Sequence, residues 1–158
     1  MAVLQPSDIV DIGIEKEIKR RDFYALAAEH FSDSAALAKL FSKLRDWEEG
    51  HIRKFQKIRE EVKGGNYAES YPGEIHEYMA AVVNSDLYEN LDAESFALTV
   101  KTPEAALDAG IGFEKDAILF FGGLANFVDP KSRKVIQELI SEEQMHMLQL
   151  FEMKKKLK

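Results

Sequence analysis

The sequence predicts an all-α protein: a four-helix bundle made of two antiparallel helical hairpins joined by a long crossover. Apolar residues recur at helical spacing through four long segments, at about residues 7–31, 33–63, 103–127 and 130–157. Only short breaks separate the two segments of each pair, whereas about residues 64–102 separate the pairs. The chain of 158 residues is 46% hydrophobic, which suits a single helical domain over residues 1–158.

The first hairpin is expected to begin just after Pro6, with Ser7 or Asp8 capping the first helix. The polar stretch Ser32-Asp33-Ser34 interrupts the helical pattern and offers new caps for the second helix. Because this link is so short, the two helices are expected to be antiparallel neighbours. Gly64-Gly65-Asn66 then ends the second helix.

The crossover contains a predicted turn at Tyr71-Pro72-Gly73 and a predicted short helix over about residues 74–83. Thr102-Pro103 is a strong helix start, since threonine is a good cap and proline fits the first helical position. Asp129-Pro130 repeats this signal at the start of the fourth helix. A four-helix bundle with one long crossover has the ferritin-like arrangement.

Composition excludes several classes of function. The net charge of −7 argues against a nucleic-acid surface, which normally carries a basic stripe. No apolar run approaches the roughly 20 residues that span a bilayer, and the N-terminus lacks the features of a signal peptide. A cytoplasmic protein without a membrane partner is therefore expected. The absence of cysteine excludes disulfides, iron–sulfur clusters and thiol catalysis.

A short pattern occurs twice. Glu48-Glu49-Gly50-His51 and Glu143-Gln144-Met145-His146 share the form Glu-x-x-His, and each follows an earlier helix with a second shared pattern. That second pattern reads Asp11-Ile12-Gly13-Ile14-x-x-Glu17 in one copy and Asp108-Ala109-Gly110-Ile111-x-x-Glu114 in the other. The chain thus uses one two-helix unit twice, and each copy supplies two glutamates and one histidine.

Helical spacing indicates which of the acids face inward. Glu17 shares a mostly apolar line with Val10, Ile14, Arg21 and Tyr24, whereas the neighbouring Glu15 belongs to a charged line. The same test selects five further residues, Glu48, His51, Glu114, Glu143 and His146. Glu49 and Glu142 fall on charged lines and are expected to face solvent.

These inward acids predict a dinuclear metal site. Four buried carboxylates without partners would cost too much free energy, and two divalent cations would balance their charge. The predicted ligands are Glu17, Glu48, His51, Glu114, Glu143 and His146. Nitrogen and oxygen ligands of this kind bind two iron ions, or manganese or zinc. Tyr24 is expected either to approach the metals, as a hydrogen-bond donor to a ligand or as a redox-active phenol, or to be a core tyrosine with a satisfied hydroxyl. His30 and His76 are expected to be ordinary surface histidines.

At these residues the chain resembles the rubrerythrin branch of the ferritin-like diiron-carboxylate proteins. The resemblance covers about residues 8–157 and rests on Glu17 with Tyr24, Glu114 with Phe120-Phe121, and the two Glu-x-x-His patterns. It implies a non-haem diiron site that reduces hydrogen peroxide or oxygen. It also implies that Glu48 and Glu143 bridge the metals, that Glu17 and Glu114 are terminal, and that each histidine binds one iron.

Two departures from rubrerythrins bear on function. Rubrerythrins carry a rubredoxin-like domain with four cysteines, and this chain has none, so electrons are expected from a separate donor protein. Rubrerythrins also place an extra ligand glutamate after the third-helix ligand, where this chain has Ala117 and, in the repeat, Arg20. Alternatives are a ferroxidase for iron storage or buffering, an oxygenase, and a structural or partner-binding bundle with a redox-silent metal. A homo-oligomer is expected, either a plain dimer or one that exchanges hairpins.

Overall fold

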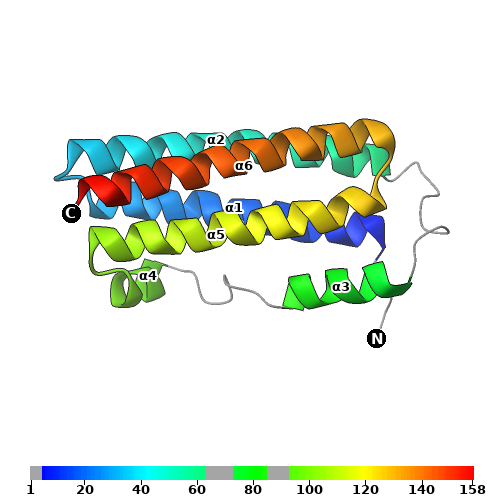
Figure 1. Ribbon diagram of the computed structural model, residues 1–158, viewed down its shortest axis with the longest axis horizontal. Coiled ribbons are helices and arrows are strands. Elements are labelled where there is room, and N and C mark those ends of the chain that lie inside the picture. Colours follow the sequence, from blue (N-terminus) through cyan, green and yellow to red (C-terminus); the bar gives the residue numbers. More distant parts are fainter. Residues whose placement is uncertain (1–4, 63–72, 85–92) are drawn as a thin grey trace.

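The computed structural model describes residues 5–62, 73–84 and 93–158, and the side chains within these ranges except those of residues 73–76, 84 and 93. Four long helices lie side by side along the long axis of the molecule (Figure 1). They are α1 (Pro6–His30), α2 (Ala35–Val62), α5 (Pro103–Leu124) and α6 (Pro130–Lys156). The predicted all-α bundle is therefore confirmed.

The helices pack first as hairpins, α1 with α2 and α5 with α6, as the short links predicted. The sequence extended the third helix to residue 127, but α5 ends at Leu124 and continues as the 3-10 turn η1 (Ala125–Phe127). Phe127 is fully buried there, and the tighter turn lets the chain reverse into α6. No described helix is both long enough and apolar enough to cross a membrane.

The crossover forms two short helices, α3 (Gly73–Asn84) and α4 (Ala93–Thr99), which lie below α5 at opposite ends in Figure 1. The helix predicted at 74–83 corresponds to α3, which packs on α5. The sequence did not predict α4, because seven residues are too few for a periodic pattern to emerge. The stop predicted at 64–66 lies outside the described residues, as do residues 71 and 72 of the turn predicted at 71–73. Gly73, the last residue of that predicted turn, is the first residue of α3.

The capping signals explain where the helices begin. Thr102 and Asp129 each accept a hydrogen bond from the backbone N–H three residues later, at 3.1 and 2.7 Å. The start of α1 differs from the prediction. Pro6 is already the first helical residue, and Gln5 caps the helix in place of Ser7 or Asp8. Asp8 lies within the first turn and accepts a hydrogen bond from the backbone N–H of Gln5 at 2.9 Å. Proline fits here because the first helical N–H has no partner within the helix.

The apolar core forms two layers, one toward each end of the bundle. One layer contains the start of α1, the end of α2, the end of α5 and the start of α6, and includes Ile9, Phe55, Phe120 and Leu139. The other contains the opposite ends of the same helices, and includes Phe23, Phe41, Phe113 and Leu150. The polar residues at the middle of each helix therefore lie between two dry layers.

The glycines of the repeat allow the helices to approach closely. A Cβ atom on Gly13 would lie 2.9 Å from Cε1 of Phe120, and one on Gly110 would lie 3.1 Å from Cδ1 of Leu150. A side chain at either position would force the facing Phe120 or Leu150 side chain to shift. Both contacts lie within one or two helical turns of a predicted metal ligand, so the glycines help to set the width of the bundle at its centre.

Candidate metal centre

All six residues predicted as metal ligands meet in the middle of the bundle. Helices α1 and α5 each supply one glutamate, and α2 and α6 each supply a glutamate and a histidine one turn apart. Every side chain is almost fully removed from solvent, with the four glutamates at 0% exposure and the histidines at 1% and 2%. We call this set the Glu/His cluster; its members are Glu17, Glu48, His51, Glu114, Glu143 and His146.

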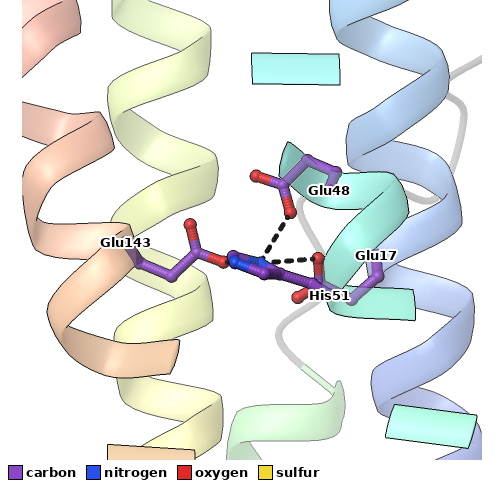
Figure 2. A group of neighbouring side chains, drawn as sticks. All are labelled: Glu17, Glu48, His51 and Glu143. Carbon is purple, nitrogen blue, oxygen red and sulfur yellow. Dashed lines mark ion pairs between the residues drawn. The ribbon is translucent and has the colours of Figure 1, made fainter. Parts of the chain in front are cut away.

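One half of the cluster surrounds His51. Its Nδ1 atom lies 2.9 Å from Oε1 of Glu143, 3.3 Å from Oε2 of Glu48 and 3.6 Å from Oε2 of Glu17. Figure 2 shows the imidazole between Glu143 on one side and Glu17 and Glu48 on the other. We call this group of four residues the Glu17 position.

The other half surrounds His146. Its Nδ1 atom lies 2.8 Å from Oε2 of Glu143, 3.6 Å from Oε1 of Glu48 and 3.8 Å from Oε1 of Glu114. We call this group the Glu114 position. In each position the candidate ligand atoms lie within 4.8 Å of one another. Glu48 and Glu143 belong to both positions, so their two oxygens can be shared between two ions.

The carboxylate oxygens of the cluster lack ordinary partners. Among the described residues, no hydrogen bond reaches Oε2 of Glu17, either oxygen of Glu48, Oε2 of Glu114 or Oε1 of Glu143. Buried acceptors without donors are rare because each costs roughly 1–3 kcal/mol, and more when charged. A pair of divalent cations would satisfy these oxygens together, and the oxygen and nitrogen donors suit iron, manganese or zinc.

A buried arginine lies against the cluster, and the sequence analysis did not predict it. Arg20 has 0% exposure; its Nη2 donates to Oε1 of Glu17, its Nη1 donates to the carbonyl of Phe113 at 3.1 Å, and its Nε lies 3.8 Å from Glu48. The helical line drawn from the sequence had instead placed Arg21 inward. That prediction was wrong: the Arg21 side chain is 31% exposed.

The error has a simple cause. Arg21 follows Glu17 by four residues, and Arg20 follows it by three, so both lie on the same side of α1. A guanidinium is rarely buried without a partner. Only the tertiary structure shows that Glu17 and Glu48 provide that partner.

Tyr24 contacts the cluster directly from the adjoining apolar layer. Its Oη donates a hydrogen bond to Oε1 of Glu114 at 2.5 Å, from α1 across to α5. Burial and the negative charge of Glu114 hold the pKa of the Tyr24 hydroxyl well above its usual range. Tyr24 therefore remains a neutral donor at ordinary pH, which fits the hydrogen-bond donor among the alternatives left open by the sequence.

Glu142 faces solvent in part, as the sequence predicted, with its side chain 25% exposed, but it also contacts the cluster, which the sequence did not predict. Its Oε2 lies 2.7 Å from Nε2 of His51, and Nζ of Lys54 lies 3.2 Å from its other oxygen. A carboxylate behind an imidazole fixes the orientation of the ring and makes it a stronger metal ligand. Glu49 lies on the surface as expected, 40% exposed and paired with Arg21 at 2.8 Å.

The four acids of the cluster differ in their proton affinity. Burial raises the pKa of Glu17 and Glu114 well above the usual range. Burial also opposes ionisation of Glu48, but the adjacent Glu17 carboxyl and the charge of Arg20 outweigh it and lower the pKa of Glu48 to about 2. Hydrogen bonds with Glu114 and the histidines lower the pKa of Glu143. The two outer acids, Glu17 and Glu114, are therefore harder to ionise than Glu48 and Glu143.

The pKa values of the two histidines are raised, whereas burial ordinarily lowers the pKa of an imidazole. Burial alone would lower the pKa of His51, but the surrounding carboxylates of Glu143, Glu17 and Glu48 raise it far above the usual range. The pKa of His146 is raised in the same manner, against burial, by Glu143 and Glu48. Each imidazole thus acts as a counter-ion for the carboxylates when no metal neutralises them, and metal binding must displace these protons.

A surface hollow leads to the cluster. It has a volume of about 250 Å³ and its lining includes Trp47, Gly50, His51 and Glu142. Trp47 is 41% exposed, and its ring meets that of His146 edge-on with centroids 5.3 Å apart. The hollow reaches His51 on the side of the ring that faces Glu142.

Of the other two histidines, His30 lies outside the site. His30 is exposed at the end of α1, where its ring contacts Phe31 and Phe96, as expected for a surface residue. His76 lies in α3, but its side chain is outside the described part of the chain, so its predicted surface position stays a prediction.

Comparison with known proteins supports the class of fold. A crystal structure from Thermotoga maritima, provisionally described as a ferritin-like diiron-carboxylate protein, matches this chain with a TM-score of 0.73. The match covers 100% of this chain and 99% of that one, at 24% sequence identity. No protein-family model and no curated protein sequence matches the chain. The protein therefore has a ferritin-like fold, and a cluster of buried glutamates and histidines lies at its centre.

Proposed function

We propose that this protein is a non-haem diiron oxidoreductase, similar to rubrerythrins, that reduces hydrogen peroxide or oxygen with electrons from a separate partner. One observation carries the proposal: four fully buried glutamates and two histidines converge, and five of the carboxylate oxygens accept no hydrogen bond from the described part of the chain. A purely structural bundle would fill this layer with apolar side chains, because unpaired buried carboxylates destabilise the fold.

The geometry supports a definite set of roles. Glu48 and Glu143 belong to both metal positions and would bridge the ions. Glu17 and Glu114 each belong to one position and would be terminal ligands, with His51 and His146 completing the two sets. When bound, iron would supply the two electrons that cleave the O–O bond of peroxide, one from each ferrous ion.

Other residues prepare the site for this chemistry. Glu142 orients His51 from the surface side, and Tyr24 orients Glu114 from the core side. The two apolar layers exclude bulk water from the cluster, which strengthens every electrostatic interaction within it. The hollow beside Trp47 is the route by which peroxide or oxygen would reach the imidazoles.

The electron supply must come from outside this chain. Reducing one peroxide to two waters consumes two electrons and two protons. The sequence contains no cysteine and so offers no iron–sulfur or rubredoxin-type carrier. A separate one-electron carrier protein would return the centre to the diferrous state between turnovers.

Anaerobic loading with ferrous iron tests the proposal. The metal-free protein is expected to bind two ferrous ions per chain. Peroxide should then produce diferric absorption much faster than oxygen does, and a reductant should restore the starting state through repeated cycles. Faster reaction with oxygen and uptake of many irons per chain would instead identify a ferroxidase. Binding of zinc but not iron would identify a structural bundle.

Two adjacent glutamates provide a matched pair of variants. Glu48→Gln removes a shared buried carboxylate, whereas Glu49→Gln changes an exposed one on the next residue. Glu48→Gln is expected to lose the second iron and the peroxide reaction, and Glu49→Gln is expected to keep both. Full iron content and activity in Glu48→Gln would contradict the ligand assignment.

A further inference from the structure

The two outer carboxylates of the Glu/His cluster have different partners. Oε1 of Glu17 accepts a hydrogen bond from the guanidinium of Arg20, which carries a permanent positive charge. Oε1 of Glu114 accepts its hydrogen bond from the neutral hydroxyl of Tyr24. The two halves of the centre therefore have the same types of candidate ligand. They differ because a positive charge lies beside Glu17 and a neutral hydroxyl lies beside Glu114.

The asymmetry originates in α1 alone. The repeat aligns Glu17 with Glu114, and the residues three positions later are Arg20 in α1 and Ala117 in α5. Seven positions later, Tyr24 of α1 corresponds to Phe121 of α5. Helix α1 thus contributes both polar neighbours of the outer acids, whereas α5 contributes only apolar side chains at the matching places.

Arg20 is held firmly in this position. Its Nη1 is bound to the carbonyl of Phe113 on α5, and its Cζ lies 5.7 Å from the centroid of the Phe121 ring. Both it and Glu17 are fully buried, so solvent cannot screen the pair. The guanidinium has little room to move away when a cation approaches Glu17.

We propose that Arg20 makes the dinuclear centre unequal, so that the Glu114 position binds a divalent metal first and the Glu17 position binds a second one more weakly. The guanidinium repels a cation at Glu17 and occupies one of its two carboxylate oxygens. The Tyr24 hydroxyl orients Glu114 without adding charge. This inference rests on the proposed dinuclear site and adds the order in which its two positions fill.

Titration of the metal-free protein with Co²⁺ alone tests the order of binding. Calorimetry and the absorption of bound Co²⁺ monitor the titration. The wild-type protein is expected to bind two Co²⁺ per chain in two separate steps. The first should be tighter by at least about tenfold, because charges a few ångströms apart in a protein interior interact strongly. Two equal steps would overturn the inference and leave the dinuclear site intact, whereas fewer than two bound Co²⁺ would contradict the dinuclear site itself.

Variants of Arg20 test the cause of the inequality. Arg20→Gln removes the charge and is expected to tighten the second step by at least about tenfold. It should also lower the unfolding temperature of the metal-free protein, because Glu17 loses its buried counter-ion. Arg20→Lys keeps the charge and should keep the two steps apart. Arg21→Gln, on the partly exposed neighbour, should leave both steps unchanged.

These opposite effects distinguish an electrostatic role from a structural one. If Arg20 only stabilised the fold, its loss would weaken both metal steps together with the unfolding temperature. An unchanged second step in Arg20→Gln would also overturn the inference.

Ligand variants assign the steps without altering Arg20, and so remain informative if Arg20→Gln does not fold. Glu17→Gln is expected to remove the weaker step and to retain the tighter one. Glu114→Gln is expected to remove the tighter step. The reverse assignment would show that the Glu17 position fills first and would refute the proposed order.

Discussion

The hydrogen bond between Tyr24 and Glu114 permits a quantitative prediction. Tyr24→Phe removes only the hydroxyl, which donates to Oε1 of Glu114 at 2.5 Å between two side chains with 0% exposure. Water cannot replace the lost donor, so the metal-free protein should lose about 2 kcal/mol of unfolding free energy, the scale of a buried hydrogen bond to an ionisable group. For a chain of this size that corresponds to a fall of about 4–8 °C in unfolding temperature.

The assay is thermal unfolding followed by circular dichroism, with and without bound zinc. A metal at Glu114 would satisfy the same carboxylate, so the zinc-loaded variant should lose clearly less stability than the metal-free one. Tyr78→Phe, which alters a tyrosine of α3 that is 47% exposed, serves as the control and should change little. Equal losses in both tyrosine variants, or no loss in metal-free Tyr24→Phe, would refute the reasoning.

Three further predictions concern groups in and beside the cluster. Asp116→Asn breaks a buried 3.1 Å ion pair with Lys16 and should lower the free energy of unfolding by about 3 kcal/mol. Denaturant titration measures this loss, and an unchanged free energy of unfolding would contradict the prediction. In the metal-free protein the pKa values of His51 and His146 are raised. Their stabilisation is therefore complete below about pH 6.5 and declines at higher pH, by up to about 1.4 kcal/mol per pH unit for each histidine. Denaturant unfolding at about pH 6 and pH 8.5 checks this sign, and a flat profile would contradict it. Trp47 is the only tryptophan, and its ring touches that of His146, so Co²⁺ should quench its fluorescence until a chelator is added. Unchanged emission with Co²⁺ bound would place the metal away from His146.

Much of the fold was readable from local patterns. Helical periodicity and the caps at Thr102 and Asp129 depend on residues close together in the sequence, and the structure has helices beginning at both places. Helix α4 escaped prediction because its seven residues form only about two turns and bury Phe96 against Phe23, a contact between distant segments. Short helices of this kind are stabilised by packing rather than by their own sequence.

The candidate centre was also predicted in part from local patterns and in part only visible in the structure. The repeated Glu-x-x-His pattern and the apolar lines were enough to select six residues, because spacing along a helix fixes which side chains share a face. The glycines of the repeat were visible in the sequence as well, but their purpose was not. Only the structure shows that Gly13 lies against Phe120 and Gly110 against Leu150.

The charged neighbours of the site were decided by tertiary structure alone. Sequence spacing favoured Arg21 over Arg20 and placed Glu142 in solvent, since an isolated charge is costly to bury. The fold buries Arg20 beside Glu17 of its own helix by bringing partners from other helices, Glu48 of α2 and the Phe113 carbonyl of α5. It also brings His51 within reach of the partly exposed Glu142. The sequence by itself thus determined the four long helices, the bundle class and the six candidate ligands, which follow from periodicity within single helices. The charge balance around those ligands depends on contacts between helices, and periodicity carries no information about such contacts.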